Sequence, residues 1–193
     1  MLLNAHGTSK GKIGVFIEEH FDMTEYRLFN KRLPAEGFDL EYISNLWGNS
    51  TLQFGSNPDN GWVEEHLIVA KDVKDVVPSE YSGFLIIGAY ATDRLRYTVN
   101  PAKGKANDAP AVELLRKIMA TPGVKVGTIC HSLWLLCADR SLLEGKKVTC
   151  AHNIICDVEN AGGDVQYGDD GTVGSVVDGD LITAKHPAFM DEL

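Results

Sequence analysis

Short apolar runs alternate along this chain with amphipathic segments, and the alternation predicts strands separated by helices. The run KIGVFI over residues 12–17 predicts a buried strand. In residues 23–36 the apolar side chains repeat at helical spacing, and Gly37 follows where a helix commonly ends. Residues 38–43 alternate again and predict a second strand. The first part of the chain therefore predicts a β-α-β unit.

The same two signals continue to the end of the chain. Further strands are predicted at residues 84–87, 124–129, 147–150, 173–177 and 181–184. Further helices are predicted at residues 109–120, 133–138 and 154–161, with a loop or small hairpin at residues 45–61. This order predicts an α/β fold with a mostly parallel sheet and helices on both faces. With neither repeat nor linker, residues 12–193 are expected to form one domain after an extended or disordered segment of residues 1–11.

Composition narrows the class of protein. A length of 193 residues, 44% of them apolar and 23% charged, suits a soluble globular domain. A formal net charge of -9 argues against a nucleic-acid surface. The N-terminus lacks a signal-peptide core, and the most apolar stretch, residues 84–88, is too short to cross a bilayer. We therefore expect a cytoplasmic protein with reduced cysteines and without membrane or nucleic-acid partners.

Polar and ionisable residues follow three of the predicted strands. In an open parallel sheet, ligands gather outside the carboxyl ends of the strands. Three such ends carry polar or glycine-rich segments: Glu18, Glu19 and Asp22 after the first strand, Gly88, Ala89 and later Asp93 after residues 84–87, and Cys130, His131 and Ser132 after residues 124–129. We expect a thiol, an imidazole and several carboxylates to share one edge of the sheet.

Cys130 is the candidate nucleophile in this group. A residue between a strand and a helix projects from a sharp turn, and a helix N-terminus favours thiolate over thiol. His131 is the nearest imidazole, and the backbone N–H groups of Ala89 and His131 could form an oxyanion hole. The alternative is a buried Cys130 beside an exposed His131. Position alone leaves both open.

Other kinds of site fit the sequence less well. No G-x-G-x-x-G motif follows the first strand, so a dinucleotide cofactor is not expected. An acidic metal pocket of Glu18, Glu19 and Asp22 would need an Asp at the end of the central strand, where Ile87 stands. Cys150, His152 and Cys156 lack the spacing of a zinc site. Core positions are the simpler expectation for Cys137, Cys150 and Cys156, and we expect no metal and no cofactor.

Several longer motifs resemble the ThiJ/PfpI superfamily of flavodoxin-like proteins. The centre is GTICHS at residues 127–132, followed by LLEGKKVT at residues 142–149. DVENAGG at residues 157–163 and VDGDLIT at residues 177–183 are similar to the PfpI branch. The resemblance extends from residue 12 almost to the C-terminus. It implies a flavodoxin-like three-layer sandwich of the type seen in class I glutamine amidotransferases.

The resemblance also implies roles for single residues. Cys130 matches the reactive cysteine and His131 its histidine. Asp22 takes the position of the carboxylate that touches the cysteine, and Asp93 that of the carboxylate that orients the histidine of a neighbouring subunit. A homodimer or larger homo-oligomer is therefore expected. Gly88, Ala89 and His131 correspond to the oxyanion hole, with Glu19, Ser132 and His186 near the rim of the substrate site.

Four positions depart from the family pattern: Asp22 and Asp93 replace Glu, Ala89 replaces Gly, and Ser132 follows Cys-His in place of Gly. Residues 98–108 form an insertion that either covers the site, alters assembly or is a surface loop. The resemblance implies a glyoxalase III-type activity on small α-oxoaldehydes, or amide and peptide hydrolysis. The alternative is a redox sensor or stress-protective protein in which Cys130 is oxidised to a sulfinate.

Overall fold

The first predicted strand becomes the centre of a seven-stranded sheet. In the computed structural model, β1 (Gly11–Phe16) pairs in parallel with both β2 (Phe38–Ser44) and β6 (Gly83–Ile86). The structure describes residues 9–57, 64–169 and 171–188. The strand order is β12-β13-β7-β6-β1-β2-β5, and only the edge strand β12 pairs antiparallel. The mostly parallel sheet predicted from the sequence is confirmed.

The elements follow one another as the hydrophobic pattern indicates. The remaining strands are β3 (Leu52–Gly55), β4 (His66–Val69), β5 (Lys71–Asp72), β7 (Lys125–Ile129), β8 (Lys147–Val148), β9 (Asp164–Val165), β10 (Tyr167–Gly168), β11 (Gly171–Thr172), β12 (Ser175–Asp178) and β13 (Leu181–Ala184). The α-helices are α1 (Met23–Ala35), α2 (Ala91–Leu95), α3 (Pro110–Met119), α4 (Arg140–Leu143) and α5 (Ile155–Asn160). Short 3-10 helices are η2 (Val73–Asp75), η3 (Pro78–Glu80), η4 (Ser132–Ala138) and η5 (His152–Ile154).

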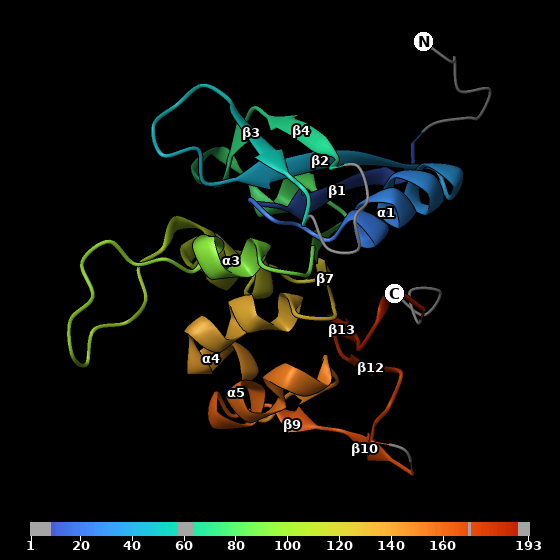
Figure 1. Cartoon of the computed structure of the whole chain (residues 1–193), viewed down its shortest axis with the longest axis vertical. Helices are drawn as coiled ribbons and strands as arrows, with labels where there is room; N and C mark the ends of the chain where they lie inside the picture. Colours follow the sequence, from blue (N-terminus) through green and yellow to red (C-terminus); the bar gives the residue numbers. More distant parts are fainter. Residues whose placement is uncertain (1–8, 58–63, 170, 189–193) are drawn as a thin grey trace.

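Alternating side chains of β1 divide the core between the two faces of the sheet. Phe16 packs in one cluster with Val112, Leu115 and other residues of α3, η4, α4 and α5. Val15 packs in a second cluster that includes Phe29 of α1 and Phe54 of β3. Figure 1 shows α1 on one side of the sheet and α3 with α4 on the other. The chain is a three-layer α/β sandwich, as predicted.

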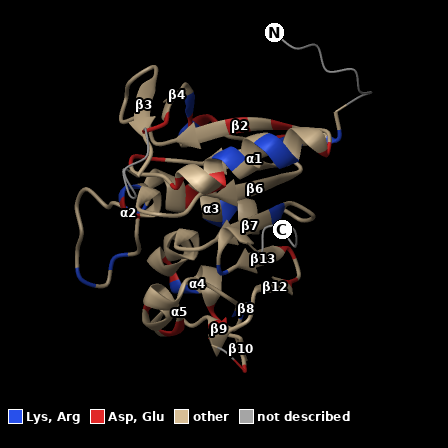
Figure 2. Cartoon of the chain, turned by 45° about the vertical axis from the view of Figure 1, so that its right-hand side comes forward, with Lys and Arg blue, Asp and Glu red and all other residues tan. Residues whose placement is uncertain are grey.

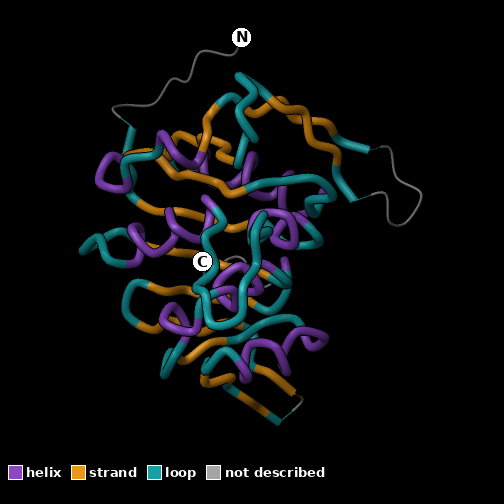
Figure 3. Tube along the Cα trace, turned by 90° about the vertical axis from the view of Figure 1, so that its left-hand side faces the viewer, coloured by secondary structure: helices purple, strands orange, loops and turns teal. Residues whose placement is uncertain are grey.

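Two small hairpins extend the sandwich at its ends. The segment predicted as a loop or hairpin at residues 45–61 contributes β3, which pairs antiparallel with β4. Figures 1 and 3 show this β3–β4 hairpin and the β10–β11 hairpin at opposite ends of the molecule. Within the part of the chain that the structure describes, no helix is long and apolar enough to cross a membrane.

The helix predicted after His131 is a 3-10 helix, η4. Its burial repeats every third residue: Ser132 and Leu135 are buried, as are Leu133 and Leu136, whereas Trp134 and Cys137 are half-buried. Side chains three apart eclipse in a 3-10 helix, so this geometry buries two rows and leaves one at the surface. The helix predicted at residues 133–138 is therefore present at its predicted position, as a 3-10 helix.

The insertion at residues 98–108 contains neither helix nor strand. Figure 2 shows the segment between α2 and α3 extending away from the body, with basic residues on it. Its last part is tied down, because the guanidinium of Arg116 donates to the Asn107 carbonyl at 2.7 Å. Within a single chain the insertion is an irregular surface loop, and an effect on assembly or on access to the site stays a prediction.

Candidate active site

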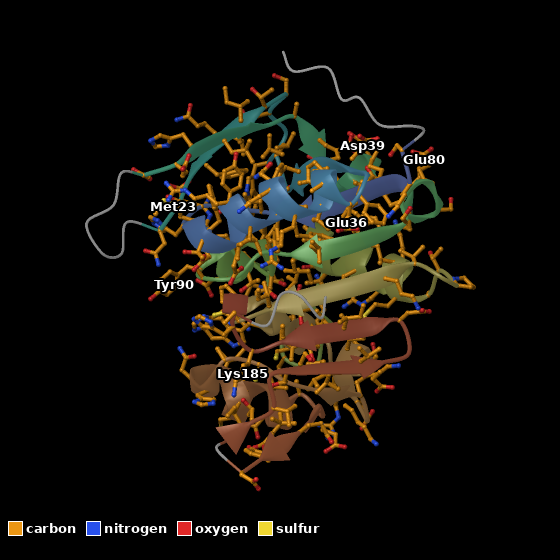
Figure 4. The ribbon with its side chains drawn as sticks, turned by 90° about the vertical axis from the view of Figure 1, so that its right-hand side faces the viewer. Met23, Glu36, Asp39, Glu80, Tyr90 and Lys185 are labelled. Atoms are coloured by element: carbon orange, nitrogen blue, oxygen red, sulfur yellow. The ribbon has the colours of Figure 1, made fainter. Side chains whose placement is uncertain are left out.

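Backbone strain gathers at one edge of the sheet. Among the described residues, four that are not glycine have positive φ: His20 at 61°, Trp47 at 53°, Ala89 at 56° and Cys130 at 57°. They follow β1, β2, β6 and β7 respectively. Figure 4 shows Tyr90, which follows Ala89, at the edge opposite Asp39 and Glu80. Left-handed residues of this kind cluster at functional sites, and this edge is where the sequence places the candidate chemistry.

Cys130 is held at its elbow by hydrogen bonds on every side. Its N–H donates to the Ala184 carbonyl of β13 at 2.9 Å, and its carbonyl accepts from the Ala151 N–H at 3.1 Å. The Ser132 hydroxyl oxygen accepts from the Ile129 N–H at 2.5 Å. Because Ser132 is fully buried and braces the elbow from inside, its predicted place at the rim of the substrate site is wrong.

The imidazole of His131 lies beside the thiol. Cys130 Sγ is 3.3 Å from His131 Nδ1, within the reach needed for proton transfer. The other ring nitrogen, Nε2, is 2.6 Å from Nδ2 of Asn153. The adjacent positions in the sequence thus do bring the two side chains together. Asn153, which no sequence motif indicates, completes the group.

A buried carboxyl from α1 faces the same elbow. Glu25 is fully buried, and its Oε2 accepts from the Gly88 N–H at 2.6 Å. Its Oε1 is buried and has no hydrogen-bond partner among the described residues. Burial raises the pKa of Glu25 well above its usual value, and the nearby charge of Asp22 acts in the same direction. Both effects favour the protonated form of the Glu25 carboxyl.

Glu25, and not Asp22, is the carboxylate with the larger electrostatic effect on the thiol. The Asp22 side chain caps α1 by accepting from the Glu25 N–H at 2.9 Å, which turns it back along the chain. Glu25 lies four residues before the buried Phe29, so both share the inward face of the helix. A glutamate on an otherwise apolar helical stripe was the sequence signal that could have identified it.

Burial also decides the state of Cys130. It raises the pKa of the thiol to about 12, and the Glu25 carboxylate, when ionised, acts in the same direction. The His131 backbone N–H bonds to the sulfur and lowers this pKa by less. The expectation that the following helix favours the thiolate is therefore wrong for the isolated chain, because desolvation outweighs the N–H groups of a 3-10 turn.

His131 is a neutral base in this environment. Burial lowers its pKa below the usual value, while the hydrogen bond with Asn153 and the charge of Asp22 act against this shift. A neutral imidazole beside a neutral thiol is a general-base arrangement and not a preformed ion pair. The proton has to move when a substrate arrives.

The other predicted site residues lie farther from the sulfur or are engaged elsewhere. Asp93 is exposed in α2 and pairs with Arg96 at 3.7 Å. The Glu19 carboxylate accepts from the Gly55 N–H of β3 at 3.1 Å. His186 is exposed after β13, where its Nδ1 accepts from the Ala188 N–H at 3.2 Å. Within the described part of a single chain, none of the three forms a hydrogen bond or ion pair with Cys130 or His131.

The predicted oxyanion hole is reduced by one donor. Glu25 occupies the Gly88 N–H, so that group is not available to a substrate. Ala89 lies next to it in the left-handed conformation and forms an isolated bridge with Phe21. The N–H groups of Ala89 and His131 remain the candidates, the latter once its bond to the thiol sulfur is released.

The remaining cysteines differ in burial. Cys150 is buried and Cys137 half-buried against the core, as expected. Cys156 is exposed on α5, so its predicted core position is wrong. Across residues 9–57, 64–169 and 171–188, no three His, Cys, Asp or Glu side chains lie close enough together to hold a metal ion.

A surface cavity opens at the same edge of the sheet. It measures about 370 Å³ and is lined by Trp47, Arg94 and Tyr97. The guanidinium of Arg94 pairs with the buried carboxylate of Glu18 at 3.2 Å, which links α2 to the end of β1. The rings of Trp47 and Tyr97 lie 6.1 Å apart.

Comparison with known proteins gives consistent similarities. The model of the DJ-1/PfpI family matches residues 11–193. Protein/nucleic acid deglycase 2 of Escherichia coli is 28% identical over 177 residues, which cover 91% of this chain and 89% of that protein. General stress protein 18 of Bacillus subtilis is 29% identical over 154 residues, covering 80% and 78%. YraA of Bacillus subtilis, a candidate cysteine protease by name, is 28% identical over 176 residues, covering 91% and 89%.

Solved structures share the fold. A two-domain protein of Anabaena variabilis, with DJ-1/ThiJ/PfpI-like and ferritin-like domains, superposes with a TM-score of 0.75 and 25% identity. The match covers 94% of this chain and 45% of that one. DJ-1beta of Drosophila melanogaster has a TM-score of 0.70 at 16% identity, covering 94% and 84%.

Proposed function

This chain belongs to the DJ-1/PfpI family, and we propose that it is a cysteine-dependent enzyme that acts on a small carbonyl compound. Cys130 is the nucleophile and His131 the acid and base. The observation that carries the proposal is the 3.3 Å approach of Cys130 Sγ to His131 Nδ1 at a strained elbow. The names of two relatives, a deglycase and a candidate cysteine protease, support chemistry at a cysteine.

The first step follows from the neutral state of the pair. His131 Nδ1 takes the thiol proton while the sulfur attacks the aldehyde carbon of an α-oxoaldehyde. The developing oxyanion is met by the N–H groups of Ala89 and His131 and takes a proton from the imidazolium. The product is a hemithioacetal, and no redox partner is required.

The second step moves hydrogen within the substrate. A base removes the proton from the former aldehyde carbon, and a proton returns to the neighbouring carbonyl carbon, which leaves a thioester on Cys130. Water then attacks the thioester, the sulfur leaves with a proton, and a 2-hydroxy acid departs. The overall change is addition of one water to the α-oxoaldehyde. We assign the proton transfers to His131, with the carboxyl of Glu25 as a second acid near the sulfur.

A small substrate suits the crowding around the thiol. Glu25 is fully buried on one side, and Ala89 carries a methyl group where the family pattern has glycine. Amide or peptide hydrolysis would use the same nucleophile, but it needs room for a chain on both sides of the carbonyl. We therefore favour an α-oxoaldehyde over a peptide.

Turnover of methylglyoxal and of a fluorogenic peptide tests the proposal. We expect the protein to produce lactate from methylglyoxal, Cys130→Ser to lose this activity, and Cys156→Ser, which changes an exposed cysteine, to retain it. Cleavage of the peptide alone would move the assignment to hydrolysis. The absence of Cys130-dependent turnover of both substrates would overturn the enzyme proposal.

One observation favours a second function. The buried Oε1 of Glu25 lacks a hydrogen-bond partner among the described residues. The same carboxyl is close enough to Cys130 to affect the pKa of its thiol. Two equivalents of peroxide would convert the thiol to a sulfinic acid and release two waters, and a carboxyl partner could stabilise that product. Intact mass of peroxide-treated protein, with Glu25→Gln as comparison, tests this redox role.

The expected homo-oligomer can be tested separately by its mass in solution. An Asp93 that orients His131 of a second copy requires a homo-oligomer, because within one chain Asp93 pairs with Arg96. Size-exclusion chromatography with light scattering measures the mass in solution, and a strict monomer would remove this role of Asp93.

A further inference from the structure

We propose that Asn153 is the positioning residue of the Cys130–His131 pair. Its side-chain amide holds the imidazole so that Nδ1 faces the thiol. The inference rests on the proposed function for its catalytic meaning, but its geometry stands on the contacts themselves. Nδ2 of Asn153 is 2.6 Å from His131 Nε2, and Nδ1 on the same ring is 3.3 Å from Cys130 Sγ. Rotation of the ring breaks both contacts.

The backbone fixes Asn153 relative to the elbow. Ala151, two residues earlier, donates its N–H to the carbonyl of Cys130 at 3.1 Å. Thr149 is anchored in turn, because its N–H donates to the Thr183 hydroxyl at 2.8 Å and its own hydroxyl donates to the Val173 carbonyl at 2.7 Å. The segment that presents Asn153 is thus tied to β7 and β13, although Asn153 itself is exposed.

An amide can serve the ring in both of its neutral forms. With Nδ2 toward the ring, Asn153 donates to an unprotonated Nε2, and the proton lies on Nδ1, ready to be donated to an oxyanion. When the amide turns over, Oδ1 accepts from a protonated Nε2, and Nδ1 is free to take the thiol proton. Asn153 can therefore follow the proton transfer without adding a charge.

The groups around the pair allow the direction of the change in the pKa of His131 to be predicted for substitutions at Asn153. Asp22, at the start of α1, is the carboxylate that acts on His131, whereas Glu25 and Asp22 both act on Cys130. With Oδ1 turned toward a protonated Nε2, the hydrogen bond with Asn153 holds the pKa of His131 up against burial. Loss of the amide should lower this pKa further, and a carboxylate at the same place should raise it.

Asp93 of a second copy is the competing candidate for the same task. Within the described part of one chain, its side chain is exposed and pairs with Arg96 at 3.7 Å, and it forms no hydrogen bond with His131. If a partner supplied it, Asp93→Asn would change the behaviour of His131 and Asn153 would matter less. The two assignments thus predict different variants to be affected.

The test compares Asn153→Ala, Asn153→Asp and Asp93→Asn with the unchanged protein. NMR of nitrogen-15-labelled histidine follows the tautomer and pKa of His131, assigned with His131→Gln. We expect Asn153→Ala to lower the His131 pKa and mix its tautomers, Asn153→Asp to raise the pKa, and Asp93→Asn to leave both unchanged. A His131 that titrates alike in all four proteins would overturn the proposal, as would a change confined to Asp93→Asn.

Kinetics with methylglyoxal adds a second readout. Asn153→Ala should lower kcat by about 10- to 100-fold, since a positioned acid or base contributes about 10²- to 10⁴-fold and only its orientation is lost. KM should stay within about twofold. Asn153→Asp should keep most of the activity, with the acid limb of its pH profile moved to higher pH.

Failure of the proposed function is distinguishable from failure of this inference. If the unchanged protein turns over no substrate, the NMR titrations still decide whether Asn153 controls His131. If circular dichroism shows that Asn153→Ala does not fold, the comparison of Asn153→Asp with the unchanged protein still tests whether the pKa of His131 rises as expected. A fall in kcat in both variants with an unchanged His131 pKa would indicate a structural role only and refute the positioning role.

Discussion

Replacement of Ala89 by glycine measures the strain at the edge of the sheet that carries the site. Ala89 has a φ of 56° between β6 and α2, in a region where a side chain is disfavoured. Its side chain is 9% exposed. Ala161, at the end of α5, is also 9% exposed but has a φ of -78°. The two alanines thus differ mainly in the sign of φ, which makes Ala161→Gly the matched control.

Three contributions set the expected change in the free energy of unfolding. Relief of the left-handed conformation stabilises by about 1–2 kcal/mol. The added freedom of glycine in the unfolded chain destabilises by about 0.4–1 kcal/mol. Loss of a buried methyl group costs about 0.8 kcal/mol. At Ala89 these contributions nearly cancel, whereas at Ala161 only the two costs remain, so the variants should differ by about 1–2 kcal/mol.

Urea unfolding followed by tryptophan fluorescence and circular dichroism is the assay. Equal slopes in the two variants would justify a comparison of midpoints. In thermal unfolding, the expected difference corresponds to about 2–8 °C for a chain of this size. If Ala89→Gly destabilises as much as Ala161→Gly, the left-handed residue stores no strain, and the argument that links strain to this edge fails.

Two further predictions concern the groups that support the elbow. Because the folded-state pKa of Glu25 is raised, its contribution to stability is full below its ordinary value of 4.5 and is lost as pH rises through the folded value. Glu25→Gln should therefore match the unchanged protein in urea near pH 5 and exceed it near pH 9; parallel pH curves would contradict a raised pKa. Ser132→Ala leaves the buried Ile129 N–H without its acceptor and should cost about 1–3 kcal/mol, measured by urea unfolding. An unchanged midpoint would show that another acceptor replaces the hydroxyl.

The pattern of hydrophobic and polar residues along the chain was sufficient to predict the layers of the fold. The strand predicted at residues 12–17 appears as Gly11–Phe16, and the helix predicted at residues 23–36 appears as Met23–Ala35. Both signals are local, because burial on one or two faces fixes the period of the apolar residues. The type of the helix η4 did not follow from the pattern, since the apolar run at residues 133–138 is too short to distinguish a 3-10 from an α-helix.

The candidate nucleophile also followed from local information. Cys130 stands directly after a buried strand, and parallel topology brings the ends of such strands to one edge. Its neighbour His131 needed only the turn between them to come within 3.3 Å of the sulfur. The sequence alone therefore determined the class of the fold, the edge of the sheet that carries the candidate site and the candidate thiol at its centre.

Only the tertiary structure decided which groups surround that thiol. Glu25 replaced Asp22 because a capping side chain turns back on its own helix, whereas a side chain one turn later points into the sheet. Asn153 reached His131 from a segment 22 residues away. The neutral state of Cys130 depends on how much solvent the folded chain removes around it. Contacts and desolvation of this kind arise from packing between distant segments, which a local pattern of polar and apolar residues does not specify.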